Sequence, residues 1–385
     1  MVKIDSPANC CGCTACANIC NRKAITMIED NEGFLYPVVN EVLCNNCALC
    51  EKVCPILKRK NKVYSKSYKE LYAVRHKDEN ILLNSSSGGA FSAIADWIIQ
   101  NDGVVYGAVY NEDMQVVHAR ATTDNECAKM RGSKYSQSNL SGVFLKCKND
   151  LKQGKHVLFT GTPCQIAGLK SFLVHQYDNL YTIDLVCHAV PSPRVFADYV
   201  NSVNKKYKDK LNHINMRYKK SCGWSHSFSF CYSFCSGKVI VDPIGLSNWG
   251  RYFFSGYIDR PSCHQCLFTN FDREGDITIA DFWDDLMLRP DLKSSKGTSL
   301  LMVNTEKGLK LFTQISSLYI WKISEYESLQ RCLIKPSDAS PKREEFWKYY
   351  LQNGYDETIK KFFPISQKRV LYQTVKKIIK SLLNY

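Results

Sequence analysis

Hydrophobic and polar positions along the chain follow two different periods, and together they predict a mixed α/β body with antiparallel additions. Period-2 or continuous apolar runs bounded by turn residues predict strands at residues 71–75, 104–110, 116–121, 157–160, 181–186, 228–234, 238–241, 277–280 and 299–303. Apolar positions with helical spacing predict helices at residues 90–99, 165–173 and 193–207. Strands that alternate with helices are typical of a sheet whose helices cover its faces.

Cysteine is concentrated at the start of the chain, where nine of the nineteen cysteines fall within the first 54 residues. Eight of these nine form two sets that share the spacing C-x2-C-x2-C-x3-C. The sets are Cys10, Cys13, Cys16 and Cys20, and then Cys44, Cys47, Cys50 and Cys54. Between them, residues 24–29 and 34–39 flank a turn and predict a short β-hairpin.

This double spacing resembles the two-cluster bacterial ferredoxin module over about residues 8–58 and predicts two four-iron, four-sulfur clusters. In that arrangement three closely spaced cysteines bind one cluster and the fourth binds the other. The expected ligand sets are therefore Cys10, Cys13 and Cys16 with Cys54, and Cys44, Cys47 and Cys50 with Cys20. Two zinc sites are the alternative, because C-x2-C also binds zinc, but eight thiolates in this spacing favour iron. Cys11 does not fit the spacing and is expected to be a bystander.

Composition excludes several classes of protein. The chain has 385 residues, of which 45% are hydrophobic and 23% charged, so it has room for two or three domains and is neither disordered nor fibrous. No apolar run reaches the ~18 residues of a membrane-spanning helix, and the first residues have no signal-like apolar core. A disulfide-rich protein would be short and secreted, and this chain is neither, so its cysteines are expected to be metal ligands. We therefore expect a cytoplasmic protein.

The net charge of +14 is concentrated in residues 55–69, which hold six Lys/Arg and no acid, and in residues 359–385, which hold seven Lys/Arg and no acid. Residues 59–70 are predicted to be a basic linker, and residues 331–385 a helical basic tail. The rest of the chain is nearly neutral, which argues against a nucleic-acid partner. In the tail, one helical face is apolar and the rest is basic, so this helix either docks on the protein or a second subunit, or lies on an anionic membrane. The apolar positions are Leu371, Val375, Ile378, Ile379, Leu382 and Leu383.

Four further cysteines are predicted to gather at one edge of the sheet. Cys164 and Cys187 each follow a predicted strand, and the carboxyl ends of parallel strands form the ligand-binding edge of such a sheet. Cys263 and Cys266 add a C-x2-C pair on a loop, which completes a four-cysteine site for a third cluster. The alternative is two buried thiols and an incidental pair. The remaining cysteines lack ligand spacing and are expected to be small buried residues: Cys127, Cys147, Cys222, Cys231, Cys235 and Cys332.

Six motifs occur in order along the body: SSSGGAF (85–91), RGSKYSQS (131–138), LFTGTPCQ (158–165), DLVCHAVPSP (184–193), RPSCHQC (260–266) and REGDITIADFW (273–283). With the ferredoxin module in front, they make the chain resemble the coenzyme F420 hydrogenase/dehydrogenase beta-subunit family over about residues 1–318. The resemblance implies an α+β and α/β multidomain fold. Its parts would be a ferredoxin domain at 1–58, a flavin-binding body divided into an N-terminal domain at 71–153 and a C-terminal domain at 154–330, and the tail.

The same resemblance implies a flavin and a redox function. It places FAD near Ser87, Gly88, Gly89, Lys134, Thr160, Gly161 and Thr162. In this arrangement Lys134 would neutralise the charge of a phosphate group or of the reduced flavin. The alternative is that Lys134 is an ordinary solvated lysine with no role in binding. Family members pass electrons between clusters, FAD and a deazaflavin or another partner, and bacterial members often accompany surface-polysaccharide genes. The predicted protein is an FAD-dependent iron–sulfur oxidoreductase acting on a small molecule or a redox partner protein. An electron-transfer subunit without its own substrate and a zinc-ribbon-like interaction protein are the alternatives.

Overall fold

The computed structural model describes residues 1–60, 63–221, 223–224, 228–243, 247–283, 289–328 and 330–364. The apolar face predicted for residues 371–383, and Cys222, lie outside these residues. No helix in the described part of the chain is both long enough and apolar enough to cross a membrane.

The N-terminal module contains the predicted hairpin. Strands β1 (Ile25–Glu29) and β2 (Leu35–Val39) pair antiparallel, with Ile25 opposite Val39. Short helices surround the hairpin: η1 (Pro7–Asn9), α1 (Ala15–Ile19), α2 (Leu49–Lys52) and α3 (Pro55–Lys60). The module therefore has the ferredoxin-like form that the cysteine spacing predicts.

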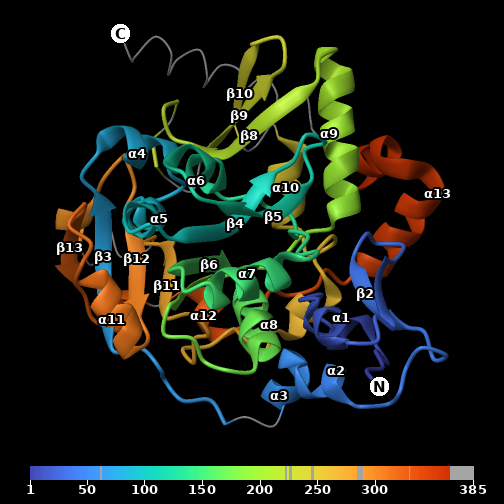
Figure 1. Cartoon of the computed structure of the whole chain (residues 1–385). Coiled ribbons are helices and arrows are strands. Elements are labelled where there is room, and N and C mark those ends of the chain that lie inside the picture. The colour runs from blue at the N-terminus through green and yellow to red at the C-terminus, as the bar shows by residue number, and fades with distance from the viewer. Residues whose placement is uncertain are drawn as a thin grey trace.

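An eight-stranded mixed sheet is the centre of the body (Figure 1), with the strand order β13-β3-β12-β11-β7-β6-β4-β5. Strands β4, β6, β7 and β11 are parallel, and the other four join antiparallel. The strands are β3 (Glu70–His76), β4 (Val104–Tyr110), β5 (Val116–Ala121), β6 (Val157–Gly161), β7 (Leu180–Leu185), β11 (Ile277–Asp281), β12 (Ser299–Val303) and β13 (Leu318–Lys322). All the strands predicted here are confirmed, and β13 was not predicted.

Helices cover both faces of this sheet, as the alternation of side chains along its strands requires. On β4, Val105 packs under the helices of one face, whereas Val104 and Tyr106 pack under those of the other. The first face is covered by α5 (Ala90–Gln100), α6 (Asp124–Met130) and α11 (Glu306–Phe312). The second is covered by α7 (Val143–Lys152) and α8 (Pro163–Leu173), and the ferredoxin module packs onto these two helices.

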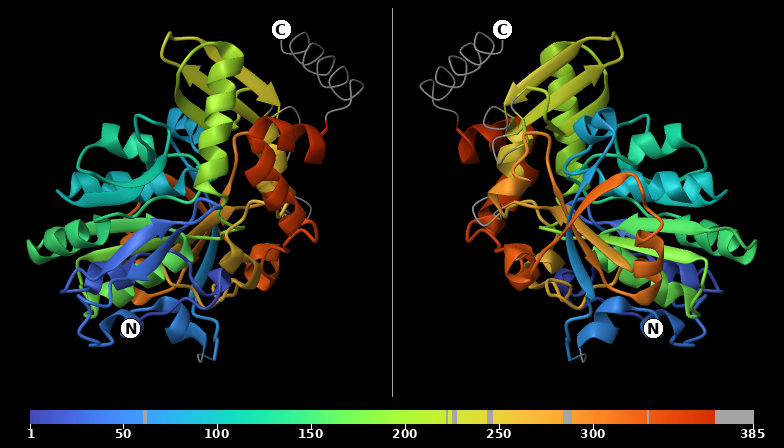
Figure 2. Two further views of the ribbon diagram at one scale, coloured as in Figure 1. Left: turned by 90° about the vertical axis from the view of Figure 1, so that its right-hand side faces the viewer. Right: turned by 90° about the vertical axis from the view of Figure 1, so that its left-hand side faces the viewer.

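A smaller antiparallel sheet lies above the large one (Figures 1 and 2), in the order β10-β9-β8. The β9–β10 hairpin (Ser229–Phe234 and Val239–Pro243) is confirmed, whereas β8 (Leu211–Tyr218) was not predicted, because its sequence shows neither strict alternation nor a continuous apolar run. This sheet packs against an aromatic-rich group of helices. They are α9 (Pro193–Tyr207), α10 (Asn248–Phe253) and α13 (Arg343–Phe362). The remaining helices are α4 (Glu79–Asn84), η2 (Pro261–Gln265), η4 (Pro290–Leu292), η5 (Tyr326–Ser328) and α12 (Arg331–Ile334).

The predicted segments do not correspond to separate structural units. The large sheet takes β3, β4 and β5 from residues 71–153 and its other strands from residues 154–328, so the two segments share one sheet. The predicted linker is also anchored: Arg59 lies in α3, is 4% exposed, and forms ion pairs with Asp272 and Glu274. Because α13 packs against α9, the first part of the predicted tail belongs to the body.

Candidate metal centre

The two cysteine sets of the ferredoxin module follow the same backbone path. Gly12 and Asn46, 34 residues apart, have positive φ angles of 69° and 54°. Thr14 and Ala48, again 34 residues apart, have φ angles of 64° and 58°, and each precedes a short helix. Left-handed conformations are unusual for residues other than glycine, so their repetition shows that the sequence repeat is also a structural repeat.

The first expected ligand set surrounds one small cavity. Cys10, Cys13, Cys16 and Cys54 all line it, although Cys54 is 38 residues beyond Cys16 in the chain. The Gly12 N–H donates to the Cys10 sulfur at 3.4 Å. Backbone N–H groups that point at sulfur stabilise the thiolate form, which is the form that binds iron.

The second expected ligand set lies closer to the solvent. Cys20 packs beside Cys50, and these two sulfurs accept N–H groups from Ala24 at 3.3 Å and Val2 at 3.2 Å. Cys44 is half-buried and Cys47 is exposed. The fourth cysteine of each repeat thus lies with the other set, in the crossed arrangement that the spacing predicts.

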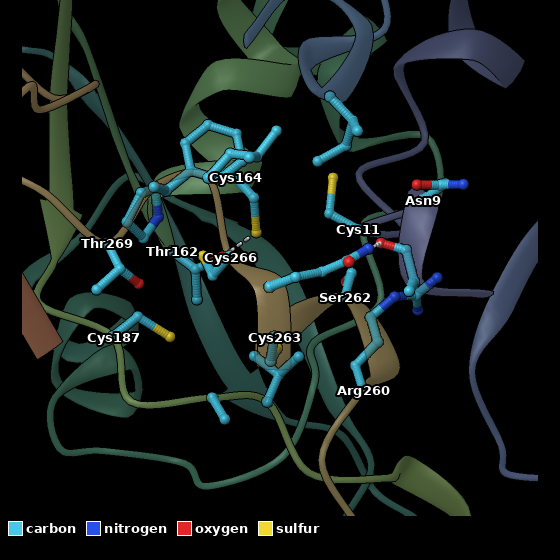
Figure 3. Close-up of a pocket in the computed structure, with 18 of the residues that line it drawn as sticks. Asn9, Cys11, Thr162, Cys164, Cys187, Arg260, Ser262, Cys263, Cys266 and Thr269 are labelled. Atoms are coloured by element: carbon cyan, nitrogen blue, oxygen red, sulfur yellow. Dashed lines mark hydrogen bonds between the residues drawn. The ribbon is translucent and has the colours of Figure 1, made fainter. Parts of the chain in front are cut away.

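A third group of cysteines lines a cavity of about 320 Å³ between the ferredoxin module and the large sheet (Figure 3). Cys164 follows β6 and Cys187 follows β7, and these two strands are parallel, so both thiols emerge at the predicted edge. Cys263 and Cys266 come from η2 and the residue after it. Cys11, which was expected to be a bystander, reaches into the same cavity from the ferredoxin module.

Burial governs the protonation of these thiols. It raises the pKa of Cys187 well above the usual value, and the thiols of Cys263 and Cys164 raise it further. Such thiols ionise only where a metal supplies positive charge. In the described parts of the chain, no three Cys, His, Asp or Glu side chains converge as the ligands of a single ion do. The four expected ligands instead line the walls of the cavity.

The Arg260 side chain, which lines the third cavity, connects the body of the protein to the ferredoxin module. It is 1% exposed, and its guanidinium donates to the Cys10 carbonyl at 2.7 Å, to Gln137 Oε1 at 2.9 Å and to the Leu35 carbonyl at 3.0 Å. The guanidinium carbon lies 4.4 Å from the centroid of the Tyr36 ring. The bonds to Cys10 and Leu35 and the cation–π contact with Tyr36 hold the first cysteine loop and strand β2 on the body, and the bond to Gln137 fixes the guanidinium itself.

Helix α8 approaches the first cysteine set through a glycine. A Cβ atom on Gly168 would lie 2.6 Å from the Cys13 Cβ and 2.9 Å from its sulfur. Cys164 is one helical turn before Gly168 on the same face. This face of α8 therefore contacts the first cysteine loop and lines the third cavity.

We expect Gly168→Ala to disturb the first cluster selectively. Alanine is favoured over glycine inside a helix by up to about 1 kcal/mol, so α8 itself is expected to remain folded. The added methyl group would displace Cys13, and the electron paramagnetic resonance (EPR) signal of the first cluster is expected to shift or weaken, with loss of iron. The signal of the second cluster, whose ligands lie away from α8, serves as the internal control. Unchanged signals from both would show that Cys13 is not a ligand.

The residues that the resemblance assigned to FAD lie at the same edge of the sheet but form two groups. In the first, the Ser87 hydroxyl donates to the Thr298 carbonyl at 2.6 Å, and the Gly88 N–H donates to Ser299 Oγ at 2.8 Å. A Cβ on Gly88 would lie 2.3 Å from the Val74 carbonyl oxygen, so the glycine permits close packing on the sheet. Gly89, with φ of 85°, precedes α5.

The second group lies at the end of β6. The Thr160 hydroxyl donates to the Tyr106 carbonyl at 3.0 Å, and Gly161 ends the strand. Thr162 caps α8, and its hydroxyl is 3.2 Å from the Cys164 sulfur. This group therefore adjoins the third cavity, and three strands separate β6 from β3, which precedes the first group.

Lys134 is not the solvated lysine that the alternative proposed. Its amine donates to the carbonyls of Met130, Arg131 and Gly132 at 3.1–3.3 Å. Burial lowers its pKa to about 7. A buried amine with neutral partners is positioned to gain from an anion.

Two basic residues at this edge of the sheet were not predicted from the sequence. Arg217, at the end of β8, pairs with Asp281 at 3.0 Å, and its Nε and Nη2 atoms are buried without a hydrogen-bond partner among the described residues. Lys219 donates to three carbonyls, including that of Ser87, and burial lowers its pKa to about 7. The basic residues within 217–220 were the sequence signal that could have indicated these two positions. Because strand β8 was not predicted, these residues could not be assigned to a place in the fold.

The remaining described cysteines agree with the prediction at three positions. Cys127, Cys147 and Cys231 are buried. The prediction is wrong for Cys235, which is exposed because it lies at the turn after β9. Cys332 is half-buried, and its sulfur is 3.7 Å from His188 Nδ1.

Comparison with known proteins agrees with this picture of an iron–sulfur protein. Residues 9–56 match the 4Fe-4S dicluster domain, and residues 154–328 match the family described as the C terminus of the beta subunit of coenzyme F420 hydrogenase/dehydrogenase. The chain thus carries the C-terminal domain of the coenzyme F420 hydrogenase/dehydrogenase beta-subunit family together with a 4Fe-4S dicluster domain, which confirms the resemblance and favours iron–sulfur clusters over zinc.

Two known proteins are similar to the chain over most of its length. Over 335 residues the chain is 22% identical to the coenzyme F420-dependent sulfite reductase of Methanocaldococcus jannaschii, and the match covers 85% of this chain. The match covers 49% of that protein, so the chain spans about half the length of this relative. A solved structure of the F420-reducing [NiFe] hydrogenase complex from Methanosarcina barkeri matches with a TM-score of 0.46 and 18% identity, over 78% of this chain and 92% of the other.

Proposed function

We propose that this protein is an iron–sulfur flavoprotein oxidoreductase that passes electrons between three 4Fe-4S clusters, FAD and a substrate. The observation that carries this proposal is the cavity lined by Cys164, Cys187, Cys263 and Cys266, directly beside the first ferredoxin cysteine set. When bound, clusters carry single electrons, and a flavin exchanges single electrons with clusters and a hydride with an organic substrate.

The cysteines are proposed to bind the clusters in three sets of four. Cys10, Cys13, Cys16 and Cys54 would hold the first cluster, and Cys20, Cys44, Cys47 and Cys50 the second. The third would be held by the four cysteines of the larger cavity. A count of iron and acid-labile sulfide in anaerobically purified protein tests this assignment, because three such clusters contain about twelve iron atoms.

FAD is proposed to lie along the carboxyl edge of the large sheet. The proposal is supported by cationic groups at this edge that form no ion pair among the described residues or that have unsatisfied donors there. The amines of Lys134 and Lys219 donate to carbonyl groups, and the Lys134 amine also lies 5.6 Å from the centroid of the Tyr110 ring. Arg217 has two buried nitrogen atoms without hydrogen-bond partners among the described residues. Phosphate groups would satisfy such donors. The two groups of residues at this edge would flank the flavin, one on each side of these basic residues. They are Ser87, Gly88 and Gly89, and Thr160, Gly161 and Thr162.

Lys134→Ala is expected to weaken FAD retention several-fold without unfolding the protein, because the change removes charge more than packing. Fluorescence titration of flavin into the apoprotein measures the effect, and Lys129→Ala, at an exposed lysine of α6, is the matched control. Equal affinity in the two variants would exclude Lys134 from the flavin site. If the wild-type protein binds no flavin at all after reconstitution, the flavoprotein proposal fails.

The same titration should depend on pH. The free amine of Lys134 titrates near pH 7, and a bound phosphate favours its charged form. Binding above pH 7 must therefore take up a proton, so we expect the affinity for FAD to fall as the pH rises from about 7 to 9. In the Lys134→Ala variant, the affinity for FAD should fall less steeply with rising pH. A slope identical to that of the wild type would assign the proton uptake to another group, with Lys219 as the next candidate.

An electron-transfer subunit that feeds a partner enzyme is the second candidate. One observation supports it, since the second ligand set reaches the surface at the exposed Cys47. Reduction of a small molecule by the isolated, reconstituted protein would favour the oxidoreductase, and activity only with an added partner would favour the subunit. A cytoplasmic role in surface-polysaccharide synthesis is proposed on the family resemblance, and assays of sugar-nucleotide substrates would test it.

A further inference from the structure

Arg59 joins the ferredoxin module to the loop that follows Cys266. Its side chain is buried, and its guanidinium donates to the carbonyls of Leu267 at 2.9 Å and of Asp272 at 2.7 Å. Its Nε donates to Glu274 Oε1 at 2.7 Å. One buried side chain of the module therefore holds this loop at three positions.

The main-chain groups of Glu274 connect the same loop to two further elements. Its carbonyl accepts the amine of Lys170 on α8, and its N–H donates to Asp184 Oδ2 at 3.0 Å. Asp184 is fully buried near the end of β7, where it also accepts the N–H of Gly275 at 3.2 Å. The side chain, the carbonyl and the N–H of Glu274 thus bond to three different elements.

The elements that meet at Glu274 are those that carry expected cluster ligands. Helix α3 begins directly after Cys54 of the first set. Cys164 lies in the first turn of α8, and β7 ends two residues before Cys187. The loop itself follows Cys266. The bonds of Glu274 therefore link the backbone segments of three expected ligands of the third set to that of one ligand of the first.

Arg59 also supports the wall of the third cavity. Leu267 and Phe268 line this cavity, and the Arg59 guanidinium carbon lies 4.7 Å from the centroid of the Phe268 ring. The guanidinium thus packs behind the lining residues that follow Cys266. From this position it holds ligand-bearing backbone in place.

Residues that hold metal ligands in place strongly affect metal retention, and changing them commonly costs about 10- to 100-fold in metal affinity or activity. We propose that Arg59 is a positioning residue for the third cluster site, which acts through Glu274 to fix the loop after Cys266 against the ferredoxin module. This inference rests on the third cluster of the proposed function. It predicts that loss of the Arg59 contacts weakens the third cluster before the others.

The test measures how fast each cluster loses iron to the chelator bathophenanthroline disulfonate in full-length, anaerobically purified protein. Arg59→Ala removes all the bonds to the loop. Glu274→Ala removes only the side-chain link, because the bonds to Lys170 and Asp184 use main-chain atoms. In both variants we expect the third cluster to lose iron about tenfold faster or more. EPR of the reduced protein assigns the loss to individual clusters, and the second cluster, whose ligands lie in other loops, is the internal reference.

Lys58→Ala is the matched control, because it removes one positive charge at an exposed neighbour in α3. It should lose iron at the wild-type rate. Arg59→Lys keeps the charge but cannot reach three acceptors, so it should behave like Arg59→Ala. Combining Arg59→Ala with Glu274→Ala should add little to Arg59→Ala alone, because both changes break the same contact.

The possible results lead to different conclusions. If the third cluster loses iron at the wild-type rate in both alanine variants, Arg59 does not position this site. If Arg59→Ala loses all three clusters equally fast, Arg59 acts on the fold as a whole, and the proposal is again overturned. Should Arg59→Ala fail to fold, Glu274→Ala decides by the same measurement, since this side chain is 20% exposed. If the wild-type protein contains only about eight iron atoms, the third cluster of the proposed function is wrong, and iron analysis shows this before any variant is measured.

Discussion

Replacing Cys263 and Cys266 together by serine will remove about four of the twelve expected iron atoms and abolish the signal of the third cluster. Serine is nearly isosteric with cysteine, but its hydroxyl is a poor ligand for iron in place of a thiolate. The two ferredoxin clusters are expected to keep their EPR signals, because their ligands lie in separate loops. Iron and sulfide analysis with EPR of the reduced protein measures the result.

Cys127→Ser and Cys231→Ser are suitable controls for this experiment. Both cysteines are buried, and neither lines the third cavity. Each control should keep the full iron content even if it lowers the thermal stability. A double variant at Cys263 and Cys266 that retains about twelve iron atoms would show that these cysteines do not bind a cluster.

Arg260→Ala is expected to release the ferredoxin module from its position on the body. The variant loses three hydrogen bonds of a fully buried guanidinium and leaves the carbonyls of Cys10 and Leu35 without their donors. Such a change costs about 3 to 5 kcal/mol. We expect a lower midpoint of thermal unfolding and faster proteolysis between the module and the body, and loss of iron first from the sites beside Arg260.

Two variants separate this effect from a general effect of charge. Arg22→Ala removes an exposed arginine from the same module and should change stability little. Arg260→Lys keeps the charge but cannot reproduce the planar group that reaches three acceptors, so it should remain destabilised. Wild-type stability in Arg260→Ala would show that the module is held mainly by its apolar contacts with α7 and α8.

The three cysteine sites form a continuous series from the surface to the sheet edge. The second ligand set reaches solvent at Cys47, and Cys20 and Cys50 of that set pack beside Cys16 of the first. The first cavity shares Cys11 with the third, and Thr162 joins the third to the end of β6. This order suits the proposed passage of electrons between an external partner and a flavin at the sheet edge.

Local spacing in the sequence predicted much of this protein. Ligand spacing of two and three residues dictates a loop that folds around a cluster, so the ferredoxin module was predictable from eight cysteines. Strands such as β4 and β6 were predictable because a buried parallel strand must be apolar on both faces. Cys164 and Cys187 were placed at one edge because parallel strands share their direction.

Elements stabilised mainly by distant contacts were not predictable in this way. Strand β8 is polar at several positions and depends on pairing with β9, and α13 depends on aromatic contacts with residues more than 80 positions away. Since β8 was missed, its basic end at Arg217 and Lys219 had no predicted location.

The sequence by itself determined the ferredoxin module and most strands, because ligand spacing and the alternation of apolar residues act over a few neighbouring positions. Only the tertiary structure decided how the module sits on the body. Arg260 contacts the carbonyl of a residue 250 positions earlier, and Cys11 and Cys164, which are 153 positions apart in the chain, line the same cavity. Such side chains have no local pattern, because their partners are determined by the packing of whole elements, and this packing places the Cys11 thiol in the lining of both cysteine cavities.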